Sequence, residues 1–311
     1  MVVLGSTYIP VMQALKEKLP AGVELRLFDT QRHLVAQVDD VDVLIIGSHR
    51  VTAEVIQAAR KLRLLQQHGR GVDSVDRLAA SRAGVQVANV PGGNGVAVAE
   101  LCLTLMFLLA KRVPEMQTAV LSRITGAPAG IEIAGKTLLV VGLGSAGGEL
   151  AVRANALGMT VLGVRAHPEA GAPAGVDEVL GRSRLKEALR RADFVCLLST
   201  LSEQTQGMIA SEELAAMKRT AFLINAARGA LVDYPALTVA LRSRQIAGAA
   251  FDTFWTEPAD PDDPILKEQG FFLSPHVAGF SDVSIDFVTD GVADNVRRLF
   301  EKRELRNVVP G

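Results

Sequence analysis

Four polar residues in the C-terminal half of the chain have the types and spacing needed for acid–base chemistry. Arg228 follows the apolar run AFLIN, Asp252 ends AGAAFD, and Glu257 lies in FDTFWTEP. His276 follows FFLSP. A cation, a carboxylate and a titratable imidazole are the groups required for hydride transfer to a charged keto acid with a coupled proton transfer. Singly, each has a plainer explanation: a loop charge, a turn-forming or solvated acid, or an ordinary hydrogen-bonded histidine.

A glycine-rich stretch upstream predicts where a cofactor would bind. Residues 137–165 contain an apolar run, the turn GLGSAG, a helical segment and a second apolar run. This order predicts a βαβ unit with the dinucleotide fingerprint. Gly142 would permit the tight turn, Gly144 a close approach to a pyrophosphate, and Gly147 close helix–strand packing. The following helix would present free N–H groups and its positive dipole end to the phosphates. The alternative is a glycine turn that binds nothing.

The elements that must position these residues form an alternating pattern. Short apolar runs separated by helical segments predict parallel sheets with helices on both faces. Ligands of such sheets bind beyond the carboxyl ends of the strands, so the four polar residues would project toward the cofactor turn. The predicted strands cover 2–4, 24–28, 43–46, 63–66, 86–89, 137–141, 159–164, 193–198, 221–225, 247–252 and 271–274.

Breaker residues and helix signals divide the chain. The cluster PGGNG at 91–95 marks a crossing between domains. A periodic helix over about 282–301 must pack elsewhere, and we expect it to return to the N-terminal domain. The prediction is an α/β protein with two doubly wound domains: residues 1–95 with 282–311, and residues 96–281. Two other predicted helices have expected N-caps: Ser211 for residues 212–217 and Asp233 for residues 234–242.

The composition argues against several classes of partner. The chain has 311 residues, of which 49% are hydrophobic and 22% charged, with a formal net charge of −1. These values are ordinary for a globular protein long enough for two domains, and they give no electrostatic reason to expect nucleic acid or a membrane. The apolar start MVVLG lacks the charged segment and long core of a signal peptide. We therefore expect a cytoplasmic protein that acts on a small molecule.

The cysteines and the longest apolar segment carry two further expectations. Cys102 and Cys196 lie in apolar runs without metal or redox spacing, so no metal site is expected. Residues 96–110 are too few to span a bilayer and predict a buried helix. Because such a helix needs partners on most of its sides, a subunit interface is one candidate, which favours a homodimer.

Several motifs resemble the D-isomer-specific 2-hydroxyacid dehydrogenase family, which includes glyoxylate/hydroxypyruvate reductases and phosphoglycerate dehydrogenases. QQHGRGVDSVD and ANVPGGNGVAVAE resemble its substrate-loop and crossover segments, and VVGLGSAGGELA resembles its cofactor turn. INAARGALVD, FDTFWTEP and SPHVAG match its arginine, DVFxxEP and PHxAG motifs in that order. The resemblance covers nearly the whole chain. It implies an NAD(P)-dependent D-2-hydroxyacid dehydrogenase with a Rossmann cofactor domain and a flavodoxin-like substrate domain.

The resemblance also implies roles for individual residues. Arg228 would bind the substrate carboxylate and polarise the reacting carbonyl. His276 would donate the proton during reduction, and Glu257 would favour the charged imidazole. Asp252 would meet the nicotinamide carboxamide. Further cofactor contacts are implied for Ser145, Ala146, Ala226 and Gly279, and backbone contacts to the substrate carboxylate for Arg70, Gly71 and Val72.

One departure from the NAD pattern concerns cofactor choice. An NAD enzyme usually has Asp or Glu at the end of the second fingerprint strand, to accept from the ribose 2′-hydroxyl. This chain has Arg165 there, with His167 close by and no acid until Glu169. An arginine can pair bidentately with a 2′-phosphate, which predicts a preference for NADP(H). The alternative is an NAD enzyme in which Arg165 stacks on adenine.

Three alternatives remain for the substrate and for the kind of function. The leading hypothesis is reduction of a small 2-keto acid such as glyoxylate or hydroxypyruvate. A phosphoglycerate dehydrogenase-like enzyme without a regulatory domain is the second; it would need extra cations, for which Arg50 and Arg70 are the candidates. The third is a non-catalytic dinucleotide-sensing protein on the same fold. Trp255 would either close the substrate pocket or act as a structural aromatic.

Overall fold

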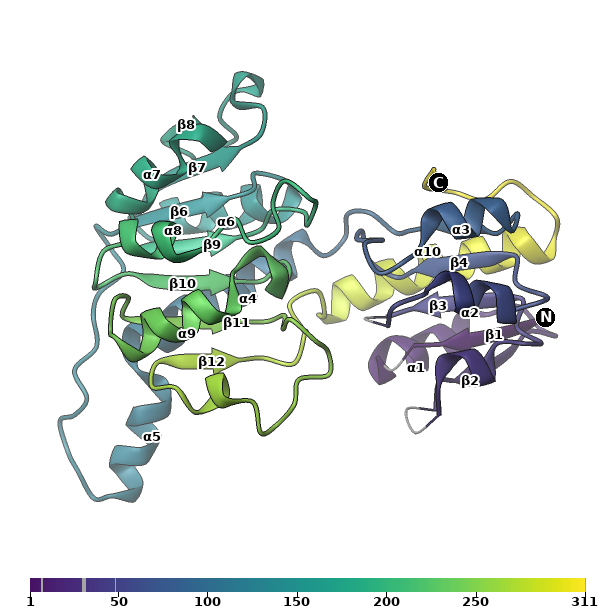
Figure 1. Cartoon of the computed structure of the whole chain (residues 1–311), viewed down its shortest axis with the longest axis horizontal. Helices are drawn as coiled ribbons and strands as arrows, with labels where there is room; N and C mark the ends of the chain where they lie inside the picture. Colours follow the sequence, from purple (N-terminus) through teal and green to yellow (C-terminus); the bar gives the residue numbers. More distant parts are fainter. Residues whose placement is uncertain (7, 30–31, 48, 311) are drawn as a thin grey trace. The chain divides into compact units, whose positions relative to one another are not determined.

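The structure is a computed structural model of the chain, and it describes residues 1–6, 8–29, 32–47 and 49–310. The chain forms two compact units. Unit 1 comprises residues 1–94 with 280–311, and unit 2 comprises residues 95–279. Each unit is a parallel sheet between two layers of helices (Figure 1).

Unit 1 has the strand order β2-β1-β3-β4-β5 with all pairs parallel. This 2-1-3-4-5 order is that of flavodoxin-like folds, as the resemblance implied. Its strands are β1 (Val2–Gly5), β2 (Glu24–Leu27), β3 (Val43–Ile46), β4 (Leu64–Gln67) and β5 (Gln86–Ala88). Its helices are α1 (Ile9–Lys18), α2 (Ala53–Ala58), α3 (Arg77–Arg82) and α10 (Asp282–Phe300), with a 3₁₀ turn η1 (Leu34–Gln37).

Two apolar layers hold unit 1 together. On one face of the sheet α2 and α3 pack through residues such as Val55 and Ala80. On the other face α1 and α10 pack against β1 and β3, with Val292 and Val296 of α10 fully buried. The C-terminal helix is therefore part of the core formed by the N-terminal strands. Its N-cap is Ser281, whose hydroxyl accepts from the Ser284 N–H.

Unit 2 has the strand order β12-β11-β10-β9-β6-β7-β8, again parallel throughout. Read from β8, this is the 3-2-1-4-5-6 order of the Rossmann fold with one added strand. The strands are β6 (Thr137–Val141), β7 (Thr160–Arg165), β8 (Glu178–Gly181), β9 (Phe194–Leu197), β10 (Phe222–Asn225), β11 (Gly248–Phe251) and β12 (Phe271–Leu273). The helices are α4 (Gly95–Lys111), α5 (Val113–Leu121), α6 (Ser145–Ala156), α7 (Leu185–Arg191), α8 (Ser211–Ala216) and α9 (Tyr234–Arg242).

Helices α7, α8 and α9 cover one face of this sheet, and α4 and α6 cover the other (Figure 1). The connecting segments contain the 3₁₀ turns η2 (Pro168–Ala170), η3 (Arg182–Arg184), η4 (Gly229–Leu231) and η5 (Pro264–Lys267). Asp233 caps α9 as predicted, because its carboxylate accepts from the Ala236 N–H at 2.8 Å. Ser211 is not a cap: the N-cap of α8 is Ala210, whose own N–H donates to Glu213 at 3.3 Å.

The long apolar helix α4 packs inside its own unit. Ala99, Cys102 and Met106 are fully buried, in a cluster that also contains residues of α6, β10 and β11. Unit 2 itself therefore supplies most of the partners that the apolar character of this helix requires, and a subunit interface on it stays a prediction. In the described part of the chain, no helix combines the length and apolar character needed to cross a membrane. Both cysteines are buried free thiols.

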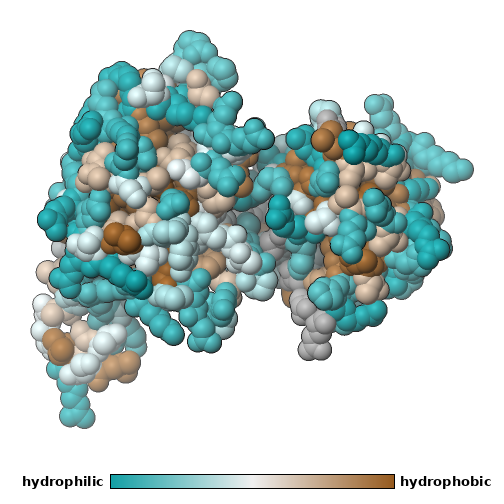
Figure 2. Space-filling view, viewed as in Figure 1, coloured by the Kyte–Doolittle hydropathy of each residue, from teal (hydrophilic) through white to brown (hydrophobic). Residues whose placement is uncertain are grey.

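A group of strongly exposed apolar side chains lies on α5 and the segment after it. Helix α5 extends away from the sheet of unit 2, and Figure 2 shows apolar surface on this projecting arm. Leu121 is 76% exposed and Val120 is 69% exposed. We call this set the α5 arm; its exposed apolar residues are Val113, Met116, Val120, Leu121, Ile124 and Ile131.

Candidate active site

Three neighbouring strands of unit 2 bring Arg228, Glu257 and His276 to one edge of the sheet. Strand β11 pairs in parallel with both β10 and β12, so their carboxyl ends lie at the same edge. Arg228 comes three residues after β10, and His276 comes three residues after β12. Glu257 lies in the loop that follows β11. These positions agree with the strand ends expected from the sequence.

His276 and Glu257 form a direct pair. The imidazole Nδ1 lies 2.6 Å from Glu257 Oε2, and the side chains are 31% and 18% exposed. The other carboxylate oxygen accepts from the Phe254 N–H at 3.0 Å. Burial acts to raise the pKa of the Glu257 carboxyl, but the hydrogen bond and charge of His276, with the nearby Arg228, outweigh it and hold the pKa below its usual value. The Glu257 carboxylate thereby fixes the orientation of the His276 ring.

The buried carboxylate of Asp252 anchors the loop on both sides of His276. It is 1% exposed, and its Oδ1 accepts from the Ser274 hydroxyl at 2.5 Å and the Val277 N–H at 2.9 Å. Its Oδ2 accepts from the Ala278 N–H at 2.8 Å. Burial raises the pKa of this carboxyl despite these bonds. His276 itself has a left-handed backbone, with φ of 56°. Asp252 therefore holds a loop conformation that a non-glycine residue adopts at some cost.

Two residues that the sequence motifs did not indicate, Asn225 and Gly229, position Arg228. Asn225 is fully buried; its amide donates to the Arg228 carbonyl at 2.8 Å and its Oδ1 accepts from the Ala227 N–H at 3.1 Å. A Cβ on Gly229 would overlap the backbone of Phe254, in the loop that carries Glu257. The polar residue closing the apolar run AFLIN was the available signal for Asn225. The glycine contact had no local signal, because its partner is distant in sequence.

The glycine turn has the close packing that its sequence predicted. Gly142 has φ of +105°, and a Cβ there would lie 2.7 Å from the Leu198 carbonyl. A Cβ on Gly147 would overlap the Gly142 carbonyl oxygen. The turn joins β6 to α6, and β6 is the strand at which the order of the sheet reverses, between β9 and β7. That reversal is where open α/β sheets bind dinucleotides.

The N-terminus of α6 presents unused backbone donors. Gly144 and Ser145 are exposed. Within the described residues, the N–H groups of Ser145, Ala146 and Gly147 have no protein acceptor. Three N–H groups at the positive end of a helix form an anion-binding site. The residues present therefore fit a pyrophosphate.

Arg165 ends β7, the strand next to the glycine turn. Its guanidinium donates to the Gly171 carbonyl at 3.3 Å. Among residues 1–6, 8–29, 32–47 and 49–310 it forms no close ion pair, although its charge helps to lower the pKa of the Glu169 carboxyl. The nearby His167 pairs with Glu169 at 3.1 Å. No acidic side chain therefore ends this strand. The other expected cofactor contacts are Ala226, directly after β10, and Gly279, in the turn after His276.

The expected substrate loop lies in unit 1, directly after β4. The buried Gln67 donates to the Gly71 carbonyl at 2.8 Å, and Asn89 donates to the Arg70 carbonyl at 2.8 Å. With the carbonyls held in this way, the N–H groups of Arg70, Gly71 and Val72 have no acceptor in the described part of the chain. The loop is thus a second set of backbone donors suited to a carboxylate.

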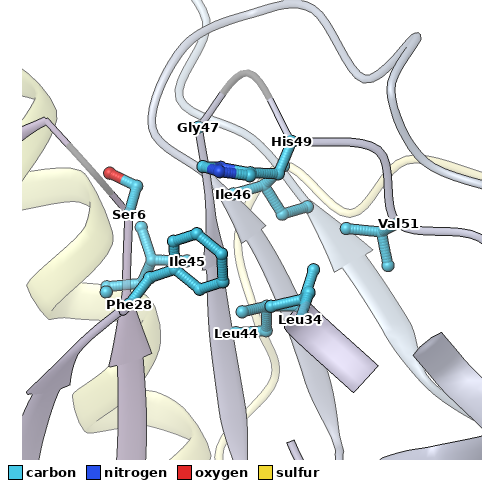
Figure 3. A pocket seen from close by; sticks show the side chains of 10 residues that line it. Ser6, Phe28, Leu34, Leu44, Ile45, Ile46, Gly47, His49 and Val51 are labelled. Carbon is cyan, nitrogen blue, oxygen red and sulfur yellow. The ribbon is translucent and has the colours of Figure 1, made fainter. Parts of the chain in front are cut away.

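A small pocket lies at the same edge of the unit 1 sheet, at the ends of β1 and β3 (Figure 3). His49 lies above its apolar wall, with its ring 4.4 Å from that of Phe28 in an edge-on arrangement. Burial lowers the pKa of His49, which favours the neutral imidazole. Among the described residues no lysine or arginine lines the pocket; its lining is Gly5, Ser6, Phe28, Leu34, Leu44, Ile45, Ile46, Gly47, His49 and Val51.

Trp255 has a structural role. Its indole N–H donates to the Val232 carbonyl at 2.7 Å. Its ring contacts that of Tyr234 edge-on, at 4.9 Å between centroids, and packs against the core of unit 2. Of the two alternatives for this residue, the structure favours the structural aromatic.

Comparisons with known proteins agree with this geometry. The sequence model of the family described as "D-isomer specific 2-hydroxyacid dehydrogenase, NAD binding domain" matches residues 103–278. The D-3-phosphoglycerate dehydrogenase of Methanocaldococcus jannaschii is 35% identical over 293 residues, covering 92% of this chain and 55% of that protein. The glyoxylate reductase of Korarchaeum cryptofilum is 35% identical over 277 residues, covering 86% of this chain and 82% of that protein.

A solved structure extends the likeness over both units. The TT0316 protein from Thermus thermophilus superposes with a TM-score of 0.84 at 31% sequence identity, covering 99% of this chain and 100% of that one. The chain spans about half the length of the phosphoglycerate dehydrogenases that it matches, 55% for the archaeal protein named above.

Proposed function

Because the chain belongs to the D-isomer-specific 2-hydroxyacid dehydrogenase family and carries its NAD-binding domain, we propose that it transfers a hydride between a nicotinamide cofactor and a small 2-keto acid, giving the D-2-hydroxy acid. The observation that carries the proposal is the His276–Glu257 pair at 2.6 Å, on a strand end two strands from that of Arg228. Unit 2 would bind the dinucleotide and unit 1 the substrate carboxylate, with boundaries near residues 95 and 282.

Each residue of the site has a proposed task. A bound nicotinamide supplies the hydride. Arg228 holds the substrate and polarises the carbonyl with its planar set of donors. His276 gives a proton to the carbonyl oxygen during reduction and takes it back during oxidation, while Glu257 balances the charge of the imidazolium. The N–H groups of residues 70–72 hold the carboxylate. Asp252 remains a proposed contact of the nicotinamide carboxamide, in addition to anchoring the loop.

NADP(H) is the proposed preferred cofactor. Support comes from Arg165, which ends β7 and forms no close ion pair with a carboxylate in the described chain. The test is the ratio of kcat/KM for NADPH to that for NADH, in the wild type and in Arg165→Ala. We expect the wild type to prefer NADPH and the variant to lose about tenfold or more of that preference, the scale of hydrogen bonds to a charged group. A wild type that prefers NADH would favour the alternative, in which Arg165 stacks on adenine.

A small substrate with no charge beyond its carboxylate, such as glyoxylate or hydroxypyruvate, is favoured over a phosphorylated one. The pocket of unit 1 has no cationic side chain among its described lining residues, and the imidazole at its mouth is held toward the neutral form. The test is NADPH and NADH oxidation with glyoxylate, hydroxypyruvate, pyruvate and 3-phosphohydroxypyruvate. We expect the highest kcat/KM with one of the first two. A preference for the phosphorylated acid would support the phosphoglycerate dehydrogenase-like alternative, and cofactor binding without oxidation would support a dinucleotide-sensing protein.

A homodimer remains part of the proposal, with the α5 arm as its main contact surface, because α4 is largely covered within unit 2. Six large apolar side chains are 40% or more exposed on this arm, which is unusual for a surface that stays in water. Analytical ultracentrifugation of the wild type should give a dimer, and the double substitution Val120→Lys with Leu121→Lys should give a monomer. A dimer that survives both lysines would place the contact elsewhere, and a monomeric wild type would exclude the proposal.

A further inference from the structure

The first residue of α4 packs directly against the first residue of α6. Gly95 is buried, and it is the residue at which unit 2 begins. A Cβ built on it would overlap the hydroxyl of Ser145 and would lie 3.3 Å from the Ser145 carbonyl carbon and 3.4 Å from the Ala146 nitrogen. Ser145 and Ala146 carry two of the three free N–H groups described above. The absence of a side chain at 95 thus affects the anion-binding turn itself.

The need for glycine at 95 is steric and not conformational. Gly95 does not have the positive φ that Gly92 and Gly93 have just before it, with values of 90° and 67°. An alanine at the start of a helix is at least as favourable as a glycine in intrinsic propensity. Helix stability alone would therefore predict that alanine at 95 is neutral or stabilising. Only the contact with Ser145 predicts a cost.

We propose that Gly95 is a positioning residue for dinucleotide binding, because its missing side chain lets the Ser145 hydroxyl and the first turn of α6 keep the orientation that receives the pyrophosphate. The inference rests on the proposed function of unit 2. With alanine at 95 the Ser145 hydroxyl must rotate away. With valine the added methyl groups also press on the backbone of α6, whose N–H groups are fixed in direction. Cofactor affinity is then lost in two steps.

The matched control lies in the same region. Gly148, in the first part of α6, has open space where a Cβ would be, with no heavy atom within 4 Å, and its φ is not positive. Gly148→Ala makes the same chemical change as Gly95→Ala without a new contact. It tests whether any alanine near the turn affects binding.

The experiment measures the Kd of NADPH and of NADH on the full chain by titration calorimetry, with Tm measured in parallel. Gly95→Ala should raise the cofactor Kd by about tenfold, the scale of one hydrogen bond to a charged group, and Gly95→Val should raise it further. The Tm of Gly95→Ala should stay at or above that of the wild type, and Gly148→Ala should bind like the wild type.

A double substitution separates a positioning role of Gly95 from general damage to the fold. In a Ser145→Ala background the hydroxyl is gone, so Gly95→Ala should cost little more than Ser145→Ala alone. Unchanged affinity in Gly95→Ala, or a loss undiminished in the double variant, would overturn the inference. A wild type that binds neither dinucleotide would instead overturn the proposed function, which keeps the two failures distinct.

Discussion

The two sheets carry different kinds of polar group at the edge formed by the carboxyl ends of their strands. At the edge of unit 1 the loop after β4 offers main-chain donors, held by Gln67 and Asn89 through hydrogen bonds of 2.8 Å to the carbonyls of that loop. At the edge of unit 2 the polar groups are charged side chains, led by the His276–Glu257 pair. At the first edge, burial holds His49 toward its neutral form. The second edge keeps a carboxylate ionised beside its histidine.

In the proposed function, this difference separates binding of the substrate carboxylate from proton transfer. Backbone N–H groups cannot titrate near neutral pH, so they can hold an anion but cannot exchange a proton with it. A paired imidazole can do both. Substitutions of side chains should therefore be severe at the edge of unit 2 and mild at the proposed substrate loop of unit 1, where the backbone donors survive a change of side chain.

The largest effect is expected for His276→Ala. Loss of the acid–base group should lower kcat by about 10²–10⁴ while cofactor affinity stays unchanged. Steady-state kinetics with glyoxylate or hydroxypyruvate, and a cofactor titration, measure both quantities. A variant with nearly normal kcat would remove His276 from the chemistry.

Arg228→Ala should follow, with kcat/KM for the keto acid lowered by about a hundredfold through loss of charge-assisted hydrogen bonds. Cofactor Kd should be unaffected. Arg228→Lys is the matched control: it keeps the charge but lacks the planar set of donors, so it should recover only a small part of the activity. Full recovery by lysine would mean that charge alone is needed, and loss of cofactor affinity would give Arg228 another task.

Glu257→Gln should change the pH dependence of stability. The folded protein lowers the pKa of this carboxyl, so its ionised form contributes stability above the usual glutamate value of 4.5, and that contribution is lost as pH falls through the lower folded value. The free energy of unfolding of the wild type should exceed that of the variant by on the order of 1 kcal/mol at neutral pH, and this difference should shrink below about pH 4.5. Urea unfolding of both proteins from pH 7 to pH 3 measures this. A difference that grows on acidification would contradict the sign.

The smallest effect is expected for Arg70→Ala. Its side chain is exposed, and its N–H group is retained in the variant. The KM for glyoxylate or hydroxypyruvate should therefore stay within about twofold of the wild type, the range of ordinary surface substitutions. A large rise in KM would mean that the guanidinium binds substrate, and it would remove the contrast between the two edges.

Much of the fold could be predicted because the spacing of apolar residues, and the capping and breaker residues at the ends of elements, are local features of the sequence. The strand 137–141 and the helix 234–242 have the bounds expected from the apolar runs and the Asp233 cap. Strand β8 was missed, because only Leu180 among its four residues is buried and it pairs with a single neighbour, β7. The packing partner of α10 could not be read from its periodicity, which shows that a face is buried but not against what.

In the site, too, some features could be predicted from the sequence and others could not. Strand ends located Arg228, Glu257 and His276, because neighbouring parallel strands end at one edge of a sheet. The contacts that orient them could not be predicted. Asp252 bonds a loop more than twenty positions away, and Gly229 packs on a loop from the next strand, so neither contact leaves a periodic signal in the sequence.

The central claim is that Arg228 and His276 act together on one keto acid whose carboxylate is held by the residue 70–72 loop. A crystal structure of the full chain with NADP⁺ and oxamate, an unreactive analogue of a 2-keto acid, tests it most directly. We expect the oxamate carboxylate on the N–H groups of residues 70–72 and on Arg228, with its carbonyl oxygen within hydrogen-bond distance of the His276 ring. Oxamate bound away from His276, or His276 separated from Glu257 in that complex, would contradict it.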